Sequence, residues 1–99
     1  SWMDEEWLYV GVHAGESIRY HLNSKKKQTV LLGLDLIVED TAQITVKIGL
    51  QSLQSTLTRS SRISHSLGKF LLIEGLNIIQ LTVDSGKIRL IGIQAIRAE

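Results

Sequence analysis

The sequence has no cysteine and no proline, and only two tryptophans, two tyrosines and one phenylalanine among its 99 residues. Without cysteine the chain can form neither a disulfide bond nor a zinc site with thiolate ligands, so the redox state of its compartment stays open. Without proline, no residue removes a backbone donor from the strand-like segments described below. The few aromatic residues limit the number of rings available to stack on a ligand.

The chain also lacks a large excess of positive or negative charge. Eleven basic and ten acidic residues give a formal net charge of +1. Because this balance creates no strong electrostatic field, the sequence predicts neither a nucleic acid nor an anionic membrane as a partner. The longest apolar run, around residues 30–34, is far shorter than the roughly 20 residues that a membrane-spanning helix needs.

What is present indicates one globular domain over residues 1–99. Hydrophobic residues make up 43% and charged residues 21% of the chain, an ordinary balance for a globular protein. A domain of this size can bury roughly two-thirds of the surface that its unfolded chain exposes. No signal peptide is recognised, since residues 4–6 are acidic where basic residues are needed. The first residues, with Trp2 and Trp7, resemble the edge of a domain excised from a larger protein.

Apolar and polar residues alternate along most of the chain, which is the pattern of half-buried β-strands. The expected strands cover residues 17–22, 29–38, 44–48, 53–58, 70–73, 79–83 and 88–96. Turns are expected at residues 23–27, 39–40, 49 and 84–86, with a serine-rich loop at residues 59–66. The leucines of residues 50–58 fit a helical spacing as well, and we assign a strand because Gly49 directly follows an obvious one. Short strands separated by turns predict an all-β sandwich or barrel.

Residues on one face of these strands are expected to form the core. They are Ile18, Tyr20, Leu32, Leu34, Leu36, Ile44, Val46, Ile79, Leu81, Ile88 and Leu90. The opposite faces also carry apolar residues, at Leu31, Ile37, Ile78, Ile91 and Ile93. Either loops and the N-terminal residues cover those faces, or a neighbouring domain or a second copy of the chain packs there.

Two segments at opposite ends of the chain carry a resemblance to a known family. The first is VGVHAGESIRYHL, residues 10–22, and the second is EGLNIIQLTVDSGKIRLIGIQAI, residues 74–96. They resemble carbohydrate-binding modules of families 6 and 35, members of the galactose-binding-like jelly-roll group. Those modules carry a run of the type VGYIDAGDWVEYTVNV near their start, and they end on G-x-H-x-L-x-L followed by N-x-D-W-I. The positions that match are Val10, Gly11, Ala14, Gly15, Tyr20, Gly75 and Gly86, with Glu16 as the acidic residue.

The resemblance covers roughly residues 9–96 and implies an antiparallel β-sandwich of jelly-roll type with about eight strands. It also implies a non-catalytic accessory module of a larger, secreted glycoside hydrolase or related enzyme, located outside the cell. Such a module binds a polysaccharide or oligosaccharide weakly, by stacking a sugar ring on an aromatic side chain. The alternative is a structural or interaction sandwich that has lost sugar binding and packs on a neighbouring domain or on its own copy.

The chain departs from the family at its ligand positions. Val12 and His13 stand where the family has its loop tyrosine, and Ser17 replaces a tryptophan. The family's ligand asparagine falls on Arg89, whose guanidinium fork suits a carboxylate. The family's first strand, whose glutamates hold a structural calcium, is missing or reduced to residues 2–8, so the usual calcium ligands are not identifiable. No cofactor is expected, and a structural calcium stays open as the alternative.

The candidate ligand-binding residues are therefore Trp7, Tyr9, His13, Glu16 and Arg89. Trp7 and Tyr9 form either a stacking platform for a sugar ring or a plug at the open end of the sandwich. The histidines show no metal-ligand spacing, and the serines lack the G-x-S-x-G motif of a nucleophile. The carboxylates at positions 35, 39 and 40 are expected to be solvated rather than a hydrolytic acid pair. We predict no catalytic residues and no metal site, so the chain is not expected to be an enzyme.

Overall fold

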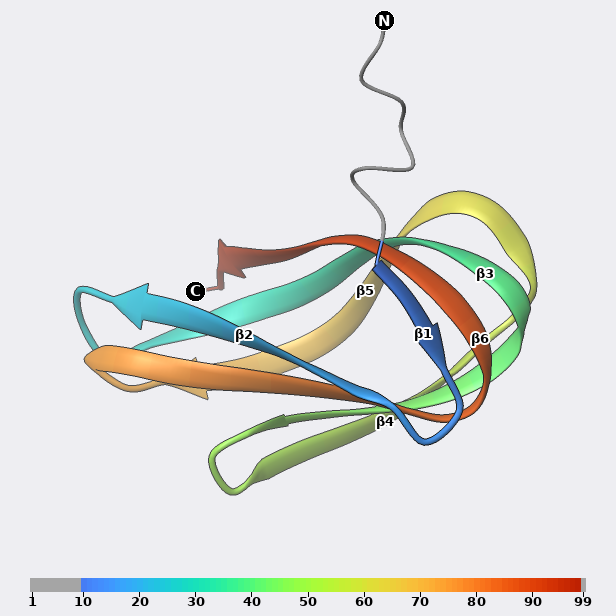
Figure 1. Ribbon diagram of the computed structural model, residues 1–99. Helices are drawn as coiled ribbons and strands as arrows, with labels where there is room; N and C mark the ends of the chain where they lie inside the picture. Colours follow the sequence, from blue (N-terminus) through green and yellow to red (C-terminus); the bar gives the residue numbers. More distant parts are fainter. Residues whose placement is uncertain (1–9, 99) are drawn as a thin grey trace, which may run out of the picture.

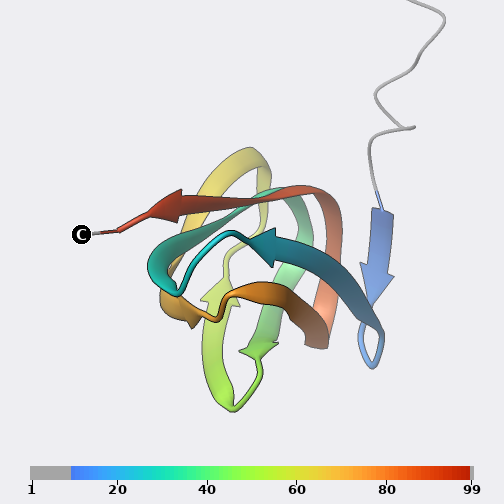
Figure 2. The same cartoon turned by 90° about the vertical axis from the view of Figure 1, so that its left-hand side faces the viewer.

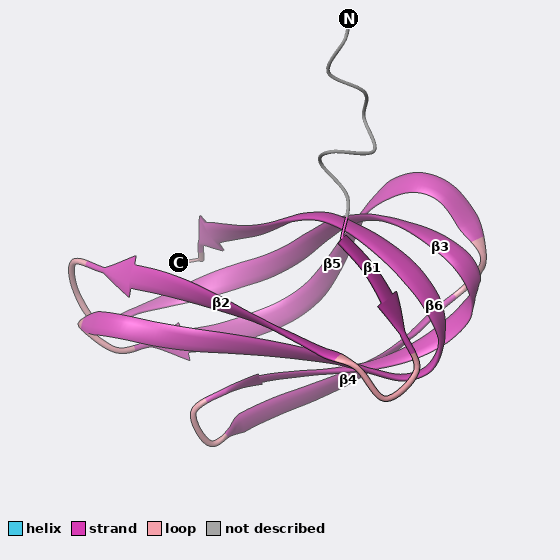
Figure 3. Cartoon of the chain, viewed as in Figure 1, coloured by secondary structure: helices cyan, strands magenta, loops and turns pink. Residues whose placement is uncertain are grey.

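The computed structural model describes residues 10–98, and these residues form an all-β fold. The strands are β1 (Val10–His13), β2 (Ser17–Ser24), β3 (Gln28–Ile48), β4 (Gln51–Leu57), β5 (Ser60–Leu72) and β6 (Gly75–Arg97). Every strand pair is antiparallel, and strands make up nearly all of the described chain (Figure 3). In residues 10–98, no helix is long and apolar enough to cross a membrane. The predicted antiparallel β-sandwich is confirmed.

The two longest strands, β3 and β6, pair along most of their length and serve both layers of the sandwich. In the first layer, the N-terminal half of β3 and the C-terminal half of β6 pair with β5 and β1. In the second layer, the other two halves pair with β4 and β2. Between the layers both strands bend, where the pairing shifts register from Asp40 with Lys87 to Gln43 with Ser85. Figure 1 shows this shared curve on the right-hand side, and Figure 2 views the sandwich from its opposite end.

The core lies between the two layers because every second residue of the paired strands points inward. Residues 30–38 and 44–48 of β3 alternate in this way, with a buried residue at each even position. All the predicted core residues are buried except Ile18 and Tyr20, which are partly buried and pack against the core from β2. Val12, Phe70 and Leu57 extend the core toward the edge strands.

Three of the predicted breaks between strands are wrong. Residues 59–66 are not a loop, because β5 begins at Ser60 and pairs with β3. The pairing runs from Ser60 with Val38 to Leu72 with Gln28. Residues 39–40 and 84–86 are not turns that end strands, because β3 and β6 bend there and continue. The prediction of a strand for the ambiguous leucine segment is confirmed, since Gln51–Leu57 forms β4 and pairs with the end of β3.

One outward-facing residue was also assigned to the wrong face. The pairing of Asp35 with Gly92 and of Leu36 with Leu90 leaves Ile91 as an extra residue on β6. A bulge of this kind reverses the alternation beyond it. Ile93 therefore points inward and packs against the core, while Ile78 is exposed on the opposite face, as predicted.

Candidate functional site

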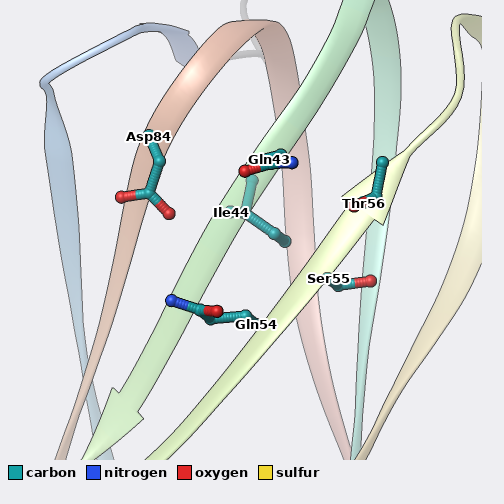
Figure 4. Close-up of a pocket in the computed structure, with 6 residues that line it drawn as sticks. All are labelled: Gln43, Ile44, Gln54, Ser55, Thr56 and Asp84. Atoms are coloured by element: carbon teal, nitrogen blue, oxygen red, sulfur yellow. The ribbon is translucent and has the colours of Figure 1, made fainter.

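A small polar pocket lies on the outer face of the second layer, close to the bend. Its volume is about 140 Å³, and its lining comes from β3, β4 and β6. Figure 4 shows Asp84 on one side of β3 and the β4 residues on the other. The lining residues are Gln43, Ile44, Gln54, Ser55, Thr56 and Asp84.

Strand alternation and register place these polar side chains together. Gln43 and Thr45 flank the buried Ile44, so both point away from the core. On β4, Thr56 pairs with Gln43 and Gln54 pairs with Thr45, so these two side chains lie on the same outer face. Ile44 and Ser55 pair with each other on the inner face, and their strands form the floor of the pocket.

One hydrogen bond fixes the carboxylate of the pocket. The Thr45 hydroxyl donates to Oδ2 of Asp84 at 2.6 Å. Within residues 10–98, Oδ1 of Asp84 and the carboxamides of Gln43 and Gln54 make no hydrogen bond to another side chain or to the backbone. Two carboxamides donate and accept, and a carboxylate accepts. The pocket therefore offers both hydrogen-bond donors and acceptors, a combination suited to ligands rich in hydroxyls. On β6, the hydroxyl of Thr82 forms a hydrogen bond with that of Ser17 at 2.8 Å.

The predicted residues His13 and Glu16 flank the turn between β1 and β2, since His13 is the last residue of β1 and Glu16 directly precedes β2. The Glu16 carboxylate accepts a hydrogen bond from the His13 backbone N–H at 2.7 Å, and the Glu16 N–H donates to the His13 carbonyl at 3.0 Å. Glu16 thus closes its own turn. The turn is held on β6 by two backbone bonds to Val83, the residue before Asp84. Both predicted side chains are exposed.

Arg89 lies on the outer face of the first layer, away from the polar pocket. Its side chain pairs with Glu39, which also contacts the Lys87 ammonium at 3.0 Å. The hydrogen bond from Lys87, together with the charge of Arg89, holds the pKa of Glu39 below its usual value. The carboxylate that suits the Arg89 guanidinium is therefore supplied by β3 of the same chain. His13 pairs with Lys87 across β1 and β6, and Gly11 pairs with Arg89.

Trp7 and Tyr9 lie outside the described residues. In residues 10–98 the aromatic side chains are Tyr20 and Phe70, and neither is exposed. Phe70 belongs to the core, and burial raises the pKa of the Tyr20 phenol above its usual value. The same part of the chain holds no group of three or more His, Asp or Glu side chains that could bind a metal ion.

The sequence did not predict the pocket, because Asp84 has the pattern of a turn residue. Alternation alone indicates that Gln43 and Thr45 point outward, since each neighbours Ile44. Their proximity to Asp84 depends on the register shift at the bend, between Gln43 with Ser85 and Ile44 with Val83. No residue pattern within a single strand specifies that shift.

We expect Arg89→Ala to change the free energy of unfolding by no more than about 0.5 kcal/mol, since surface substitutions of this kind have small effects. The arginine side chain is 43% exposed, and Lys87 still contacts Glu39 after the substitution. Urea denaturation at neutral pH measures the difference. A loss several times larger would show that the Arg89–Glu39 pair is a structural element of the first layer.

No family model and no curated protein matches this sequence. Solved structures match the fold. A carbohydrate-binding module of family 35 from Cellvibrio japonicus Abf62 has a TM-score of 0.75 at 11% identity, covering 85% of this chain and 67% of that one. A GH26-CBM35 β-(1,4)-mannanase from Podospora anserina has a TM-score of 0.75 at 17% identity, covering 84% of this chain.

A ruminal GH26 endo-β-1,4-mannanase has a TM-score of 0.77 at 14% identity and covers 92% of this chain. The present chain spans only 19% of each of the two mannanase chains. At such identities the matches establish the fold. They confirm a β-sandwich similar in fold to the family 35 module.

Proposed function

We propose that this chain is a non-catalytic carbohydrate-binding module that serves a larger, secreted glycoside hydrolase or related enzyme. The proposal is supported by the fold, which is similar to that of a family 35 module and to part of two mannanases. The observation that supports a binding site is the open polar pocket, in which Asp84, Gln43 and Gln54 have polar atoms without a hydrogen-bond partner in residues 10–98.

The chemistry of the pocket suits sugar hydroxyls. A carboxylate oxygen accepts from a hydroxyl with a charge-assisted bond, and a carboxamide can donate to one hydroxyl while accepting from its neighbour. The exposed carboxylate of Asp84 also disfavours acidic sugars, since like charges repel. Neutral polysaccharides are therefore the proposed ligand class.

Affinity for such a shallow site is expected to be weak, on the order of micromolar to millimolar, because few ligand atoms leave water. Stacking of a sugar ring on Trp7 and Tyr9, which lie outside the described residues, stays part of the proposal. The module would hold its parent enzyme near the substrate, outside the cell.

Affinity electrophoresis in gels that contain a panel of neutral and acidic polysaccharides tests this function. We expect retardation by at least one neutral polysaccharide, and we expect Asp84→Asn and Gln54→Ala each to weaken binding about tenfold, as for loss of one hydrogen bond to a ligand. Trp7→Ala should abolish binding if stacking contributes as proposed.

Gln94→Ala is the matched control, since Gln94 is an exposed glutamine on β6 in the first layer, outside the pocket. It should leave retardation unchanged. Folded protein that no polysaccharide retards would overturn the proposed function. Retardation that survives both pocket substitutions would place the sugar elsewhere on the molecule.

A further inference from the structure

A hollow opens between the two layers of the sandwich, at the end opposite the bend. Its volume is about 470 Å³, and its lining comes from β2, β3, β5, β6 and the β2–β3 loop. This loop and the C-terminal end of β6 lie at the left in Figure 1, the side that Figure 2 turns toward the viewer. We call the cavity the basic hollow, because its charged lining residues are Lys25, Lys26 and Arg97.

The bulge in β6 places Arg97 in the hollow. Arg97 pairs with the buried Val30 of β3, and side chains paired directly across two strands lie on the same face of a sheet. Without the extra residue at Ile91, alternation would turn Ile96 inward and Arg97 toward water. Instead Ile96 is 58% exposed, and Arg97 lines the space between the layers. The fold thus has a cation where its apolar neighbour would otherwise lie.

The cations of the basic hollow have no anionic partner in residues 10–98. Lys25, Lys26 and Arg97 form no ion pair there, and the lining contains no acidic residue. Glu74 directly precedes the residue that pairs with Ser24, but Glu74 neither lines the hollow nor forms an ion pair in this part of the chain. Positive charge gathered in a concave site without a carboxylate attracts an anion.

Apolar side chains form the inner wall of the basic hollow. Val30 and Leu72 belong to the core, and Leu22 packs against the core from β2. All three line the hollow, so a molecule bound there reaches the edge of the core. An apolar face placed against this wall removes both surfaces from water, which favours binding. The carboxamides of Asn23 and Gln28 also line the hollow and can bond to hydroxyls.

Hydrogen bonds fix the two segments that carry the cations. The Ser24 hydroxyl donates to the Lys26 carbonyl at 2.6 Å and accepts from the Gln28 carboxamide at 2.9 Å. Directly after β6, the Ala98 N–H donates to the Thr29 carbonyl at 3.0 Å, which holds the end of β6 against β3. The backbone positions of the cations are therefore set before a ligand arrives, and this lowers the ordering cost of binding.

We propose that the basic hollow binds a sugar that carries a phosphate or sulfate ester. The ester oxygens accept from the planar guanidinium fork of Arg97 and from the ammonium groups of Lys25 and Lys26. Such an ester offers three terminal oxygens, one for each cation, whereas a carboxylate has only two. The C–H face of the sugar ring packs against Leu22 and Leu72, and its hydroxyls bond to the carboxamides.

This site differs from the polar pocket in place and in charge. The polar pocket lies on the outer face of the second layer and contains Asp84, whereas the basic hollow opens between the layers and has no carboxylate in its lining. The two sites therefore select ligands of different charge. The inference holds whether or not neutral polysaccharides bind the polar pocket.

Titration of the ¹⁵N-labelled chain with glucose 6-phosphate and glucose 6-sulfate, followed by NMR, tests the proposal. At low salt we expect the amide signals of residues 22–30 and 95–98 to shift, with a dissociation constant on the order of 0.1–1 mM. Glucose and inorganic phosphate should each bind at least about fivefold more weakly, because each supplies only one of the two parts of the ligand. Sodium chloride at about 0.5 M should weaken binding of the esters, since salt screens exposed charges.

Arg97→Ala should raise the dissociation constant of both esters about tenfold, as for loss of a charge-assisted hydrogen bond. Lys26→Ala is a second variant with the same expected direction. Both side chains are exposed, so both variants should keep the circular dichroism spectrum of the unchanged chain. Arg19→Ala is the matched control, since it removes an exposed arginine on β2 that lies outside the hollow, and it should leave binding of the esters unchanged.

Binding of either ester at the hollow supports the proposal, and the ratio of the two affinities identifies the preferred group. Esters that shift no amide signal around the hollow overturn it, and so do esters that bind no better than glucose or inorganic phosphate. Affinity that survives both Arg97→Ala and Lys26→Ala also overturns it. Vesicles of anionic phospholipid are the last comparison. A chain that sediments with them but binds neither soluble ester would assign the cations to a lipid headgroup and contradict the sugar site.

Discussion

Gly86→Ala is expected to destabilise the fold by at least about 3 kcal/mol, a loss at the upper end of the range for single substitutions. Gly86 has a φ of +85°, where a side chain costs about 1–2 kcal/mol. In addition, a Cβ atom at this position would overlap the carbonyl oxygen of Thr41 and lie 2.7 Å from the Cα of Ala42. These contacts are backbone atoms of β3, which cannot move aside without disturbing the bend. Urea denaturation followed by circular dichroism measures the loss.

Gly15→Ala separates the cost of a side chain at positive φ from the cost of the overlap with β3. Gly15 has a φ of +90°, close to that of Gly86, but nothing lies within 4 Å of the Cβ position. We expect Gly15→Ala to cost only the backbone term of about 1–2 kcal/mol. Equal losses for the two variants would contradict the close approach of β3 and β6 at the bend.

The bend explains which part of the fold the sequence could predict. Apolar residues at every second position identify the inward faces of β3 and β6 without any knowledge of pairing, because the side-chain period of a strand is fixed at two. Residues 39–40 and 84–86 are polar or glycine, and such residues are typical of turns that end strands. In this fold the two strands stay paired on both sides of the bend, and only this pairing keeps them continuous.

The start of β5 escaped prediction for a different reason. Ser60–Leu72 is an edge strand whose outward side chains face water, so serines and arginine are tolerated there. Only Ile63 among residues 60–66 packs against the core as an apolar residue. A single apolar residue gives no alternation to detect. The bulge at Ile91 likewise leaves no mark in the sequence, although it turns Ile93 inward.

The candidate site could be predicted only in part. The family resemblance led to His13, Glu16 and Arg89, and the structure shows that Glu16 closes a turn and that Arg89 pairs with Glu39. Trp7 and Tyr9 stay predictions. The uncommitted groups of Gln43, Gln54 and Asp84 come from three strands. Their meeting depends on register, which a single sequence does not reveal.

Asn77→Asp is expected to destabilise the fold by about 2–4 kcal/mol at pH 7, because it leaves buried acceptors facing one another. Asn77 is 4% exposed. Its Oδ1 accepts from the Ile73 N–H at 3.0 Å, and its Nδ2 donates to the carbonyls of Ile73, Gly75 and Leu22 at 3.0, 3.1 and 3.5 Å. A carboxylate keeps the shape of the amide and the bond from the Ile73 N–H, but it loses all three donor bonds and is buried with a negative charge.

The loss should depend on pH in a defined direction. Burial and the facing carbonyls raise the pKa of the introduced carboxyl in the folded state above its unfolded value of about 3.9. A group whose pKa is raised on folding favours the folded state most below its unfolded pKa. The deficit of Asn77→Asp is therefore smallest below about pH 4, where the protonated carboxyl can donate one bond, and it grows as pH rises toward the raised pKa.

Asn23→Asp is the matched control for this pH dependence, since Asn23 is an exposed asparagine on the neighbouring strand β2, where it pairs with Leu76. Urea denaturation of both variants at pH 7 and pH 3.5, each compared with the unchanged chain, separates the buried site from general effects of acid. A deficit in Asn77→Asp that is the same at both pH values would contradict the hydrogen bonds assigned to the amide.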